Sequence, residues 1–223
     1  ACSTLHLNES LGHPLAKGWR LFSDDVRTIH YPALSRHVGM VAGGPPCQPF
    51  SLGGKHRAYH DERDMFPEAV RAVRELRPDC FVFENVRGLL RQNFSNYFHY
   101  IILQLTYPML ERKEQEDWST HLSKLERHHT GARETDLSYR VVYRLLDAAD
   151  YGVPQHRHRV FIVGFRSDLQ KEWSFPKPTH SLDRLLWEQW VSGQYWEELC
   201  VSKKQRPERP ARWTARIRRL ESE

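Results

Sequence analysis

The sequence has few cysteines and no long hydrophobic run, and both absences narrow the class of protein. No segment has the eighteen or so consecutive apolar residues of a membrane span, so we expect none. Reduced thiols are typical of the cytoplasm, and we expect the protein there, without disulfides. The four cysteines are Cys2, Cys47, Cys80 and Cys200. None of them belongs to a CxxC or CxxH pair, the spacing that would indicate a zinc site.

Other signatures are missing as well. The chain does not begin with Met and has no charged-then-apolar start typical of a secretory signal, so we interpret it as a processed product or a fragment. It has no internal repeat and no collagen-like, coiled-coil or disordered composition. With 223 residues and 39% hydrophobic side chains, it is long enough for one domain with its own core.

Positive charge is in modest excess, which favours an anionic partner. The chain has 33 Lys and Arg against 28 Asp and Glu, a net charge of +5. Much of the excess lies in Val201–Arg219, a basic tail whose only acid is Glu208. Pro207 and Pro210 exclude one continuous helix there. The tail is therefore either a solvated, disordered end or a segment that contacts phosphate.

Apolar segments predict an α/β fold. Short runs rich in Val, Phe and Ile indicate buried strands, and apolar residues at helical spacing indicate helices between them, so we expect a parallel sheet covered by helices. A charged stretch, 111–134, is predicted to be a polar surface insertion. The predicted strands are Val38–Ala42, Cys80–Phe83, Ser138–Leu146 and Val160–Val163, and the predicted helices are Met65–Leu76 and Tyr97–Leu110.

The most informative motif is GGPPCQPFS, residues 43–51, directly after the first predicted strand. Its two glycines and three prolines indicate a rigid turn at the carboxyl end of a strand, where ligand sites of open α/β sheets lie. A free cysteine is more often a small buried hydrophobic residue, but Pro46 and Pro49 argue against burial in a regular element. We therefore interpret Cys47 as a nucleophile presented to a cleft.

A second motif, FENV, ends the strand that begins at Cys80. A carboxylate at the end of a buried strand is costly to ionise, so Glu84 is predicted to hold a proton and to act as a general acid. Glu84 could instead cap a following helix. Asn85 is expected to bond the backbone of its own loop.

The third motif, YGVPQHRHR, spans residues 151–159 and leads into the last predicted strand. Alternation along an extended segment places Gln155, Arg157 and Arg159 on one side and His156 and His158 on the other. The two histidines lack a third ligand in the sequence, so no metal site is expected. Arginines on one face suit an oxygen of a base or of a phosphate.

In this order and spacing, the three motifs closely resemble those of the C5-cytosine DNA methyltransferases of bacterial restriction-modification systems. The resemblance covers about two thirds of the chain, from Asp25 to Arg166. It implies a Rossmann-like α/β fold, dependent on S-adenosylmethionine, whose first strands are absent from this sequence. It also implies a DNA (cytosine-5) methyltransferase that acts on a flipped-out base.

The resemblance also implies roles for individual residues. Cys47 would add to C6 of cytosine, while Glu84 would protonate or hydrogen-bond ring N3 and the exocyclic amine. Residues 48–65 resemble the family's mobile loop that closes over DNA. Gln155, Arg157 and Arg159 would hold the cytosine O2, neighbouring backbone or that loop. The implied substrate-binding residues are Pro46, whose carbonyl would accept from the amine, Gln48, Ser51 and Asn85.

The methyl donor implied by the resemblance is S-adenosylmethionine, yet the chain lacks part of the expected site. Neither FxGxG before Gly43 nor GxGxxG anywhere is present. Asp25 is the candidate contact to the adenine, with Pro45 as a second cofactor contact. Asp24 is the alternative candidate for this contact. Asp25 could instead be a simple turn residue.

The resemblance further predicts two parts, a partial catalytic domain over 1–178 and the start of a target-recognition region over 179–223. The second part contains a tryptophan-rich segment, His180–Trp196, and the basic tail. The implied partners are double-stranded DNA, a restriction endonuclease and a complementing methyltransferase subunit. A catalytically inactive DNA-binding remnant and an RNA cytosine methyltransferase are the alternatives, whereas a cysteine hydrolase lacks a plausible histidine partner.

Overall fold

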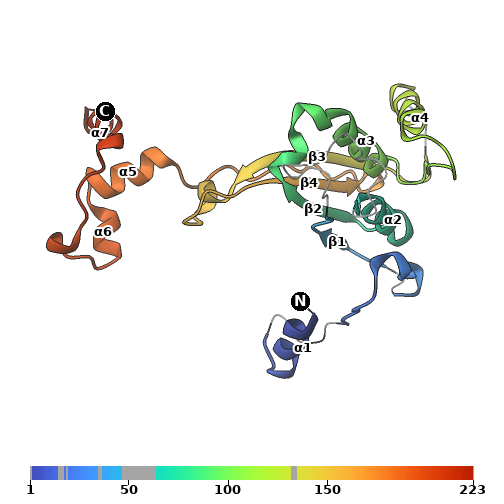
Figure 1. Cartoon of the computed structure of the whole chain (residues 1–223), viewed down its shortest axis with the longest axis horizontal. Coiled ribbons are helices and arrows are strands. Elements are labelled where there is room, and N and C mark those ends of the chain that lie inside the picture. The colour runs from blue at the N-terminus through green and yellow to red at the C-terminus, as the bar shows by residue number, and fades with distance from the viewer. Residues whose placement is uncertain are drawn as a thin grey trace.

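The computed structural model of the chain describes residues 2–14, 18, 20–34, 37–46, 64–131 and 135–222. Cys47, Gln48 and Ser51 lie outside the described residues. A four-stranded sheet occupies the middle of the molecule, with α1 (Cys2–Ser10) and the helices α5 to α7 apart from it (Figure 1). The strands are β1 (Met40–Gly43), β2 (Cys80–Val86), β3 (Tyr139–Asp147) and β4 (His158–Arg166).

The sheet has the order β1-β2-β4-β3, and its strands are of mixed direction. β1 and β2 are parallel, whereas β4 is antiparallel to both β2 and β3. The prediction of a parallel sheet is therefore wrong for β4. A parallel return needs a long crossover, which α2 supplies between β1 and β2. Only the short connection 148–157 joins β3 to β4, so those two strands run antiparallel.

Two amphipathic helices cover one face of the sheet. α2 (Phe66–Leu76) buries Phe66, Val70 and Val73, as its helical spacing predicts. α3 (Ser95–Thr106) packs beside it and buries Ile101 completely. Alternate residues of the strands, including Phe81, Phe83, Val160 and Ile162, complete this core. Because side chains alternate along a strand, Glu84 and Arg159 lie on the opposite face of the sheet.

The predicted polar insertion, residues 111–134, contains a helix that joins the core. α4 (Trp118–Thr130) fully buries Leu125, and His121 is 2% exposed. Its imidazole Nδ1 lies 2.8 Å from the Tyr100 hydroxyl of α3, and its Nε2 lies 2.9 Å from the Leu110 carbonyl oxygen. The interpretation as a purely polar surface excursion is therefore wrong, because the charged residues conceal one apolar helical face.

The basic tail is folded rather than solvated and disordered. It packs in a small helical group made of α5 (Leu182–Trp190), α6 (Gln194–Glu198) and α7 (Thr214–Ser222). No helix runs through Pro207 and Pro210, as predicted, and α7 begins after both of them. Ile217 is fully buried, because Trp213, Ile217 and Leu220 follow helical spacing. Arg216 and Arg219 pair with Asp183 of α5 at 2.5 and 3.6 Å.

The segment before β1 is held to α2 by one arginine. The Arg71 guanidinium donates to the carbonyls of Val26 and Ile29 at 2.8 and 3.0 Å and lies over the Tyr31 ring. It also pairs with Glu68 and Glu75 of its own helix. Among the described residues, no helix is long and apolar enough to cross a membrane.

Candidate functional site

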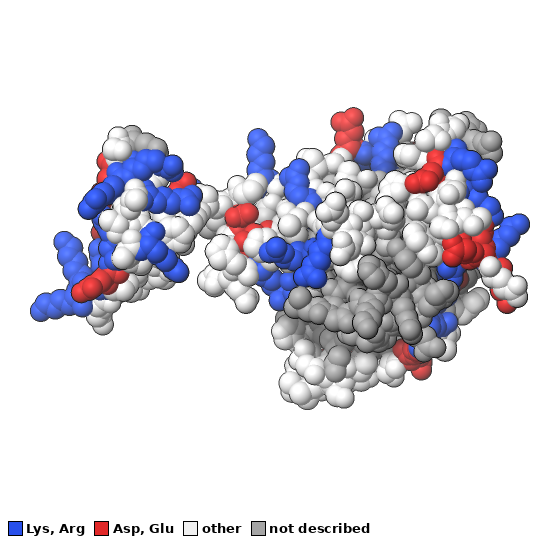
Figure 2. Space-filling model, turned by 45° about the horizontal axis from the view of Figure 1, so that its top comes forward, with Lys and Arg blue, Asp and Glu red and all other residues white. Residues whose placement is uncertain are grey.

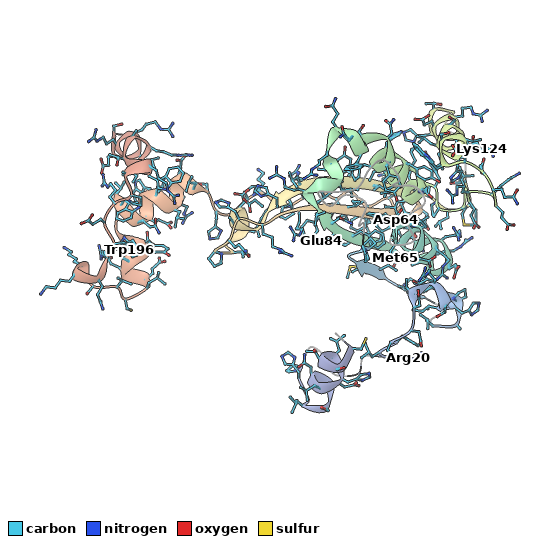
Figure 3. All side chains as sticks on the ribbon, in the orientation of Figure 1. Arg20, Asp64, Met65, Glu84, Lys124 and Trp196 are labelled. Carbon is cyan, nitrogen blue, oxygen red and sulfur yellow. The ribbon has the colours of Figure 1, made fainter. Side chains whose placement is uncertain are left out.

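The second and third motifs meet on the face of the sheet opposite α2 and α3. β4 lies between β2 and β3, so its first residues face the carboxyl end of β2. There the Arg159 Nε lies 2.6 Å from the Glu84 Oε1. Glu84, which is labelled in Figure 3, ends a buried strand, but its own side chain is 37% exposed. Its role as general acid stays a prediction.

The first motif is joined to the second by Asn85. This side chain is 7% exposed, and its amide donates to the Pro45 carbonyl oxygen at 3.0 Å. Its Oδ1 accepts from the Val86 amide, which confirms the expected bond to its own loop. A Cβ added to Gly44 would lie 3.5 Å from the Glu84 Oε2. The turn that precedes Cys47 thus lies directly against the carboxylate.

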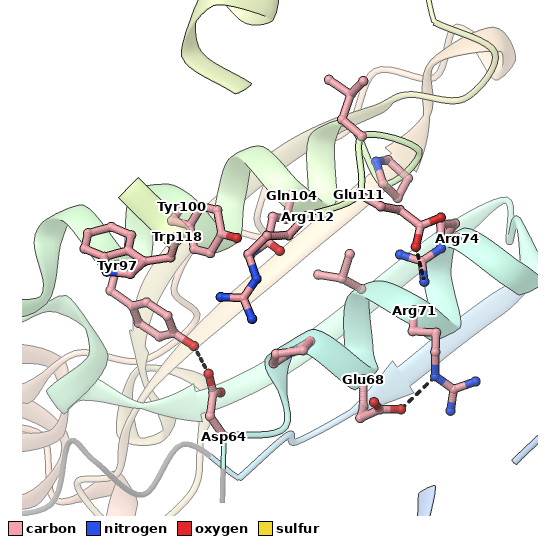
Figure 4. Close-up of a pocket in the computed structure, with 14 residues that line it drawn as sticks. Asp64, Glu68, Arg71, Arg74, Tyr97, Tyr100, Gln104, Glu111, Arg112 and Trp118 are labelled. Atoms are coloured by element: carbon pink, nitrogen blue, oxygen red, sulfur yellow. Dashed lines mark hydrogen bonds and ion pairs between the residues drawn. The ribbon is translucent and has the colours of Figure 1, made fainter. Parts of the chain in front are cut away.

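The described residues on either side of residues 47–63 are hydrogen-bonded to each other. The Met65 amide donates to the Pro46 carbonyl oxygen at 3.0 Å. Asp64 accepts from the Phe66 amide at 3.1 Å and from the hydroxyl of Tyr97 in α3 (Figure 4). A carbonyl oxygen has two lone pairs, so the Pro46 oxygen keeps capacity for one further donor.

The third motif is held by a carboxylate of the neighbouring strand. Asp147 ends β3, and its side chain contacts His156, His158 and the backbone amide of Arg157. Both histidines thus lie on one side of the segment, as alternation predicts. The side chains of Gln155 and Arg157 are exposed, and neither has a hydrogen-bond partner among the described residues.

Asp25 begins a short 3-10 turn, Val26–Thr28, that its carboxylate caps by accepting from the Arg27 amide at 3.0 Å. The Arg27 guanidinium also lies against it, and these hydrogen bonds lower the pKa of Asp25 to about 2. The carboxylate is therefore ionised near neutral pH, and its side chain is 45% exposed. Its role in contacting adenine, like that of Pro45 and Asp24, stays a prediction.

A cavity of about 270 Å³ lies on the helix side of the molecule, between α2, α3 and the segment before α4 (Figure 4). Neither Glu84 nor Arg159 lines it. Arg71 pairs there with Glu68, and Arg74 pairs with Glu111 at 3.1 Å. The charges are balanced within the wall, whose polar and aromatic residues include Asp64, Glu68, Arg71, Arg74, Tyr97, Tyr100, Glu111, Arg112 and Trp118.

Cations gather on the helical group α5 to α7 and beside the sheet (Figure 2). Several of those in the helical group form ion pairs, among them Arg184 with Glu188 and Arg209 with Glu221. Within the described ranges, no group of three His, Cys, Asp or Glu could hold a metal ion. The free thiol of Cys80 lies beside β1 and donates to the Gly39 carbonyl oxygen, and burial raises its pKa.

Asp147 and Asp64 were not predicted from the sequence. Asp147 ends a strand of clear alternation, nine and eleven residues before two histidines, which is a signal that could have been recognised. Asp64 stands one residue before Met65, the N-cap of α2, and its carboxylate accepts from the Phe66 amide. Its contact with Tyr97 joins residues 33 apart, and no local pattern predicts that.

Comparison with known proteins agrees with these motifs. The sequence model of the family "C-5 cytosine-specific DNA methylase" matches residues 15–107 and 118–217. The stretch between the two matched segments, 108–117, overlaps only the beginning of the stretch predicted to be an insertion. The chain is 34% identical over 178 residues to the type II methyltransferase M.NgoMIV of Neisseria gonorrhoeae. It is 40% identical over 144 residues to the type II methyltransferase M.AquIA of Picosynechococcus sp..

These matches cover 80% and 64% of this chain but 45% and 49% of the two relatives. The chain thus spans about half the length of the curated relatives it matches. A solved structure, that of a DNMT2 mutant from Spodoptera frugiperda, covers 80% of this chain and 43% of its own. It aligns with a TM-score of 0.43 and 18% identity.

Proposed function

Because the chain belongs to the C-5 cytosine-specific DNA methylase family, we propose that it forms the catalytic part of a DNA (cytosine-5) methyltransferase. The observation that supports this most directly is the convergence of its three motifs. Arg159 contacts Glu84 at 2.6 Å, and Asn85 holds the Pro45 carbonyl two residues before Cys47. A carboxyl group and a guanidinium thus lie at the carboxyl end of β2, beside the turn that leads from β1 toward Cys47 in the sequence.

The chemistry requires a nucleophile because C5 of cytosine becomes reactive only after addition to C6. The Cys47 thiolate forms a bond to C6, and the ring electrons move toward N3, which takes a proton from Glu84. The resulting enamine carries electron density at C5. After C5 is methylated, a base removes its proton, the C6–S bond breaks and the thiolate leaves, while N3 returns its proton to Glu84. Covalent addition divides one inaccessible step into several feasible steps.

The other site residues orient the base. Arg159 contacts Glu84 and is proposed to hold both that carboxyl and the cytosine O2. Arg157 and Gln155, whose side chains are exposed and lack partners among the described residues, are free to contact the base or neighbouring phosphates. Pro46, Gln48, Ser51 and Asn85 remain the proposed substrate-binding residues. A base in a duplex is inaccessible, so flipping it out costs about a few kcal/mol.

S-adenosylmethionine is the proposed methyl donor, and when bound it supplies the methyl group for C5. Of this chain, Asp25 and Pro45 would contact it. The exposed, ionised Asp25 carboxylate fits an amino group of adenine, although it already pairs with Arg27. Because the chain lacks a glycine-rich turn, we expect weak or no binding of the donor by this chain alone.

In this proposal double-stranded DNA is the substrate, a restriction endonuclease acts in the same cytoplasm, and a complementing methyltransferase subunit supplies missing parts of the donor site. Domains 1–178 and 179–223 remain the proposed division. The second candidate function is DNA binding without turnover, which the incomplete donor site favours. Titration of the purified chain with S-adenosylmethionine distinguishes the two: micromolar binding with turnover would contradict our expectation of weak binding.

Covalent trapping tests Cys47 itself. The chain is incubated with duplexes of randomised flanks in which pyrimidin-2-one replaces cytosine, because loss of the 4-amino group makes C6 more electrophilic and removes the need for methyl transfer. We expect a covalent adduct on a denaturing gel that Cys47→Ala abolishes and Cys80→Ala retains. With 5-fluorocytosine, an adduct should also require S-adenosylmethionine and a complemented enzyme. An adduct that persists in Cys47→Ala would show that another residue is the nucleophile.

A further inference from the structure

Asp147 is bonded through both carboxylate oxygens and is 11% exposed. Its Oδ1 accepts from the Arg157 amide at 2.8 Å and from the Ala149 amide at 3.3 Å. Its Oδ2 lies 2.7 Å from the His156 Nδ1 and 3.5 Å from the His158 Nε2. One side chain therefore joins both ends of the connection between β3 and β4.

Asp147 makes more contacts than are required to cap the turn that follows β3. Capping the 3-10 turn Ala148–Tyr151 requires only the bond to Ala149. The other contacts all reach three consecutive residues, 156–158, on the far side of the connection. There His158 faces Asp147 in the register of β3 and β4, and the Ala148 amide donates to the Arg157 carbonyl oxygen at 3.1 Å. One backbone amide and two imidazoles of this short stretch thus contact one carboxylate, and a second backbone bond joins the stretch to Ala148.

The fixed stretch leads directly into the candidate site. Arg159 follows His158, faces Leu146 in the register of β3 and β4, and reaches Glu84 of β2. The position of its guanidinium depends on where the chain enters β4, because its Nη1 also donates to the His158 carbonyl oxygen at 2.8 Å, within the stretch that Asp147 contacts. Donation from His156 and from backbone amides lowers the pKa of Asp147 to about 2, so the carboxylate keeps its charge near neutral pH.

We propose that Asp147 is a positioning residue for the methyltransferase site, which holds residues 155–159 so that Arg159 engages Glu84 and Arg157 and Gln155 face the nucleic acid. The effect on a methyltransferase site rests on the proposed function, whereas the contacts of Asp147 do not depend on it. Asp147 does not touch the reacting base. It acts through the backbone of residues 156–158, which carries the exposed Arg157 and leads into β4 at Arg159.

The test compares Asp147→Ala and Asp147→Asn with Asp150→Asn in the full chain. Asp150 lies three residues away in the same turn, and its side chain has no hydrogen bond or ion pair among the described residues. Solvent exchange of the Arg159 Nε–H proton is measured by ¹⁵N NMR, with the signal assigned through Arg159→Lys. We expect exchange to become about tenfold faster in Asp147→Ala, the effect of losing one bond to a charged group, and to stay unchanged in Asp150→Asn.

Two further measurements separate the possible failures. Where Asp147→Ala is unfolded by circular dichroism, Asp147→Asn gives the readout, since it keeps one acceptor oxygen for the Arg157 amide but loses the charge that the histidines contact. Affinity for duplex DNA, measured by fluorescence anisotropy, should fall in parallel with the loss of Arg159 protection. Unchanged Arg159 exchange in the folded variants would overturn the inference. Absence of DNA binding by the wild-type chain would count against the proposed function instead.

Discussion

A substitution of Gly164 tests the packing that holds Glu84 and Arg159 in place. Gly164 of β4 faces Phe81 of β2 in the register of the sheet. A Cβ at residue 164 would lie 2.2 Å from the Phe81 Cζ and 2.4 Å from its Cε1. The ring is fully buried and has Phe83 and Tyr139 beside it, each with centroids 5.2 Å away. Gly164→Ala must therefore displace a confined ring, and such overpacking costs about 1–3 kcal/mol.

For a chain of this size each kcal/mol lowers the melting temperature by about 2–4 °C, so we expect a decrease of about 2–12 °C by calorimetry. Gly39→Ala is the matched control, because nothing lies within 4 Å of a Cβ at that position. Phe81→Leu shortens the opposing side chain, so the double variant Phe81→Leu, Gly164→Ala should be more stable than the sum of the single effects predicts. Equal melting temperatures for Gly164→Ala and Gly39→Ala would refute this explanation.

Three other predictions concern different parts of the chain. Ile217→Ala should destabilise the group α5 to α7 by about 2–5 kcal/mol, measured by hydrogen exchange in α7, whereas Leu199→Ala, 57% exposed, should change it by less than about 0.5 kcal/mol. Arg71→Ala should release residues 26–31 from α2 and accelerate tryptic cleavage after Arg27, which Arg74→Ala should not do. Asp147 has a lowered pKa, so its stabilising contribution is complete above about pH 4 and is lost as the pH falls toward 2. In Asp147→Asn the free energy of unfolding, measured by urea denaturation, should therefore depend less on pH between about pH 4 and 2.

Local patterns predicted the elements better than their arrangement. The α/β, Rossmann-like fold class is confirmed, and β2, β3, β4 and α2 lie where runs and periodicity indicate. The direction of β4 was missed, because strand order depends on connections rather than on the residues of one strand. The helical packing of the tail was not predicted, because its charge and its prolines are typical of a disordered end, although Trp213, Ile217 and Leu220 lie at helical spacing.

The candidate site was predictable to a similar extent. Motifs identified Glu84 and Arg159 separately, and only the sheet register shows that residues 75 apart in the sequence form one ion pair. Asn85 illustrates the same limit: its own-loop bond was predicted, but its bond to Pro45 depends on the parallel pairing of β1 and β2. The contacts of Asp147 and Asp64 also depend on tertiary neighbours that sequence spacing does not supply.

The central position of β4 also affects how this chain folds during synthesis. β2 leaves the ribosome 80 residues before the end of the strand that covers its inner edge, since Cys80 pairs with Phe165 and Val86 with Arg159. At about 5–20 residues per second this interval lasts roughly 4–16 s. For that time the edge of a strand that carries Phe81 and Phe83 has no partner on that side, and open strand edges promote aggregation. Translation speed between residues 86 and 166 should therefore influence the yield of folded protein.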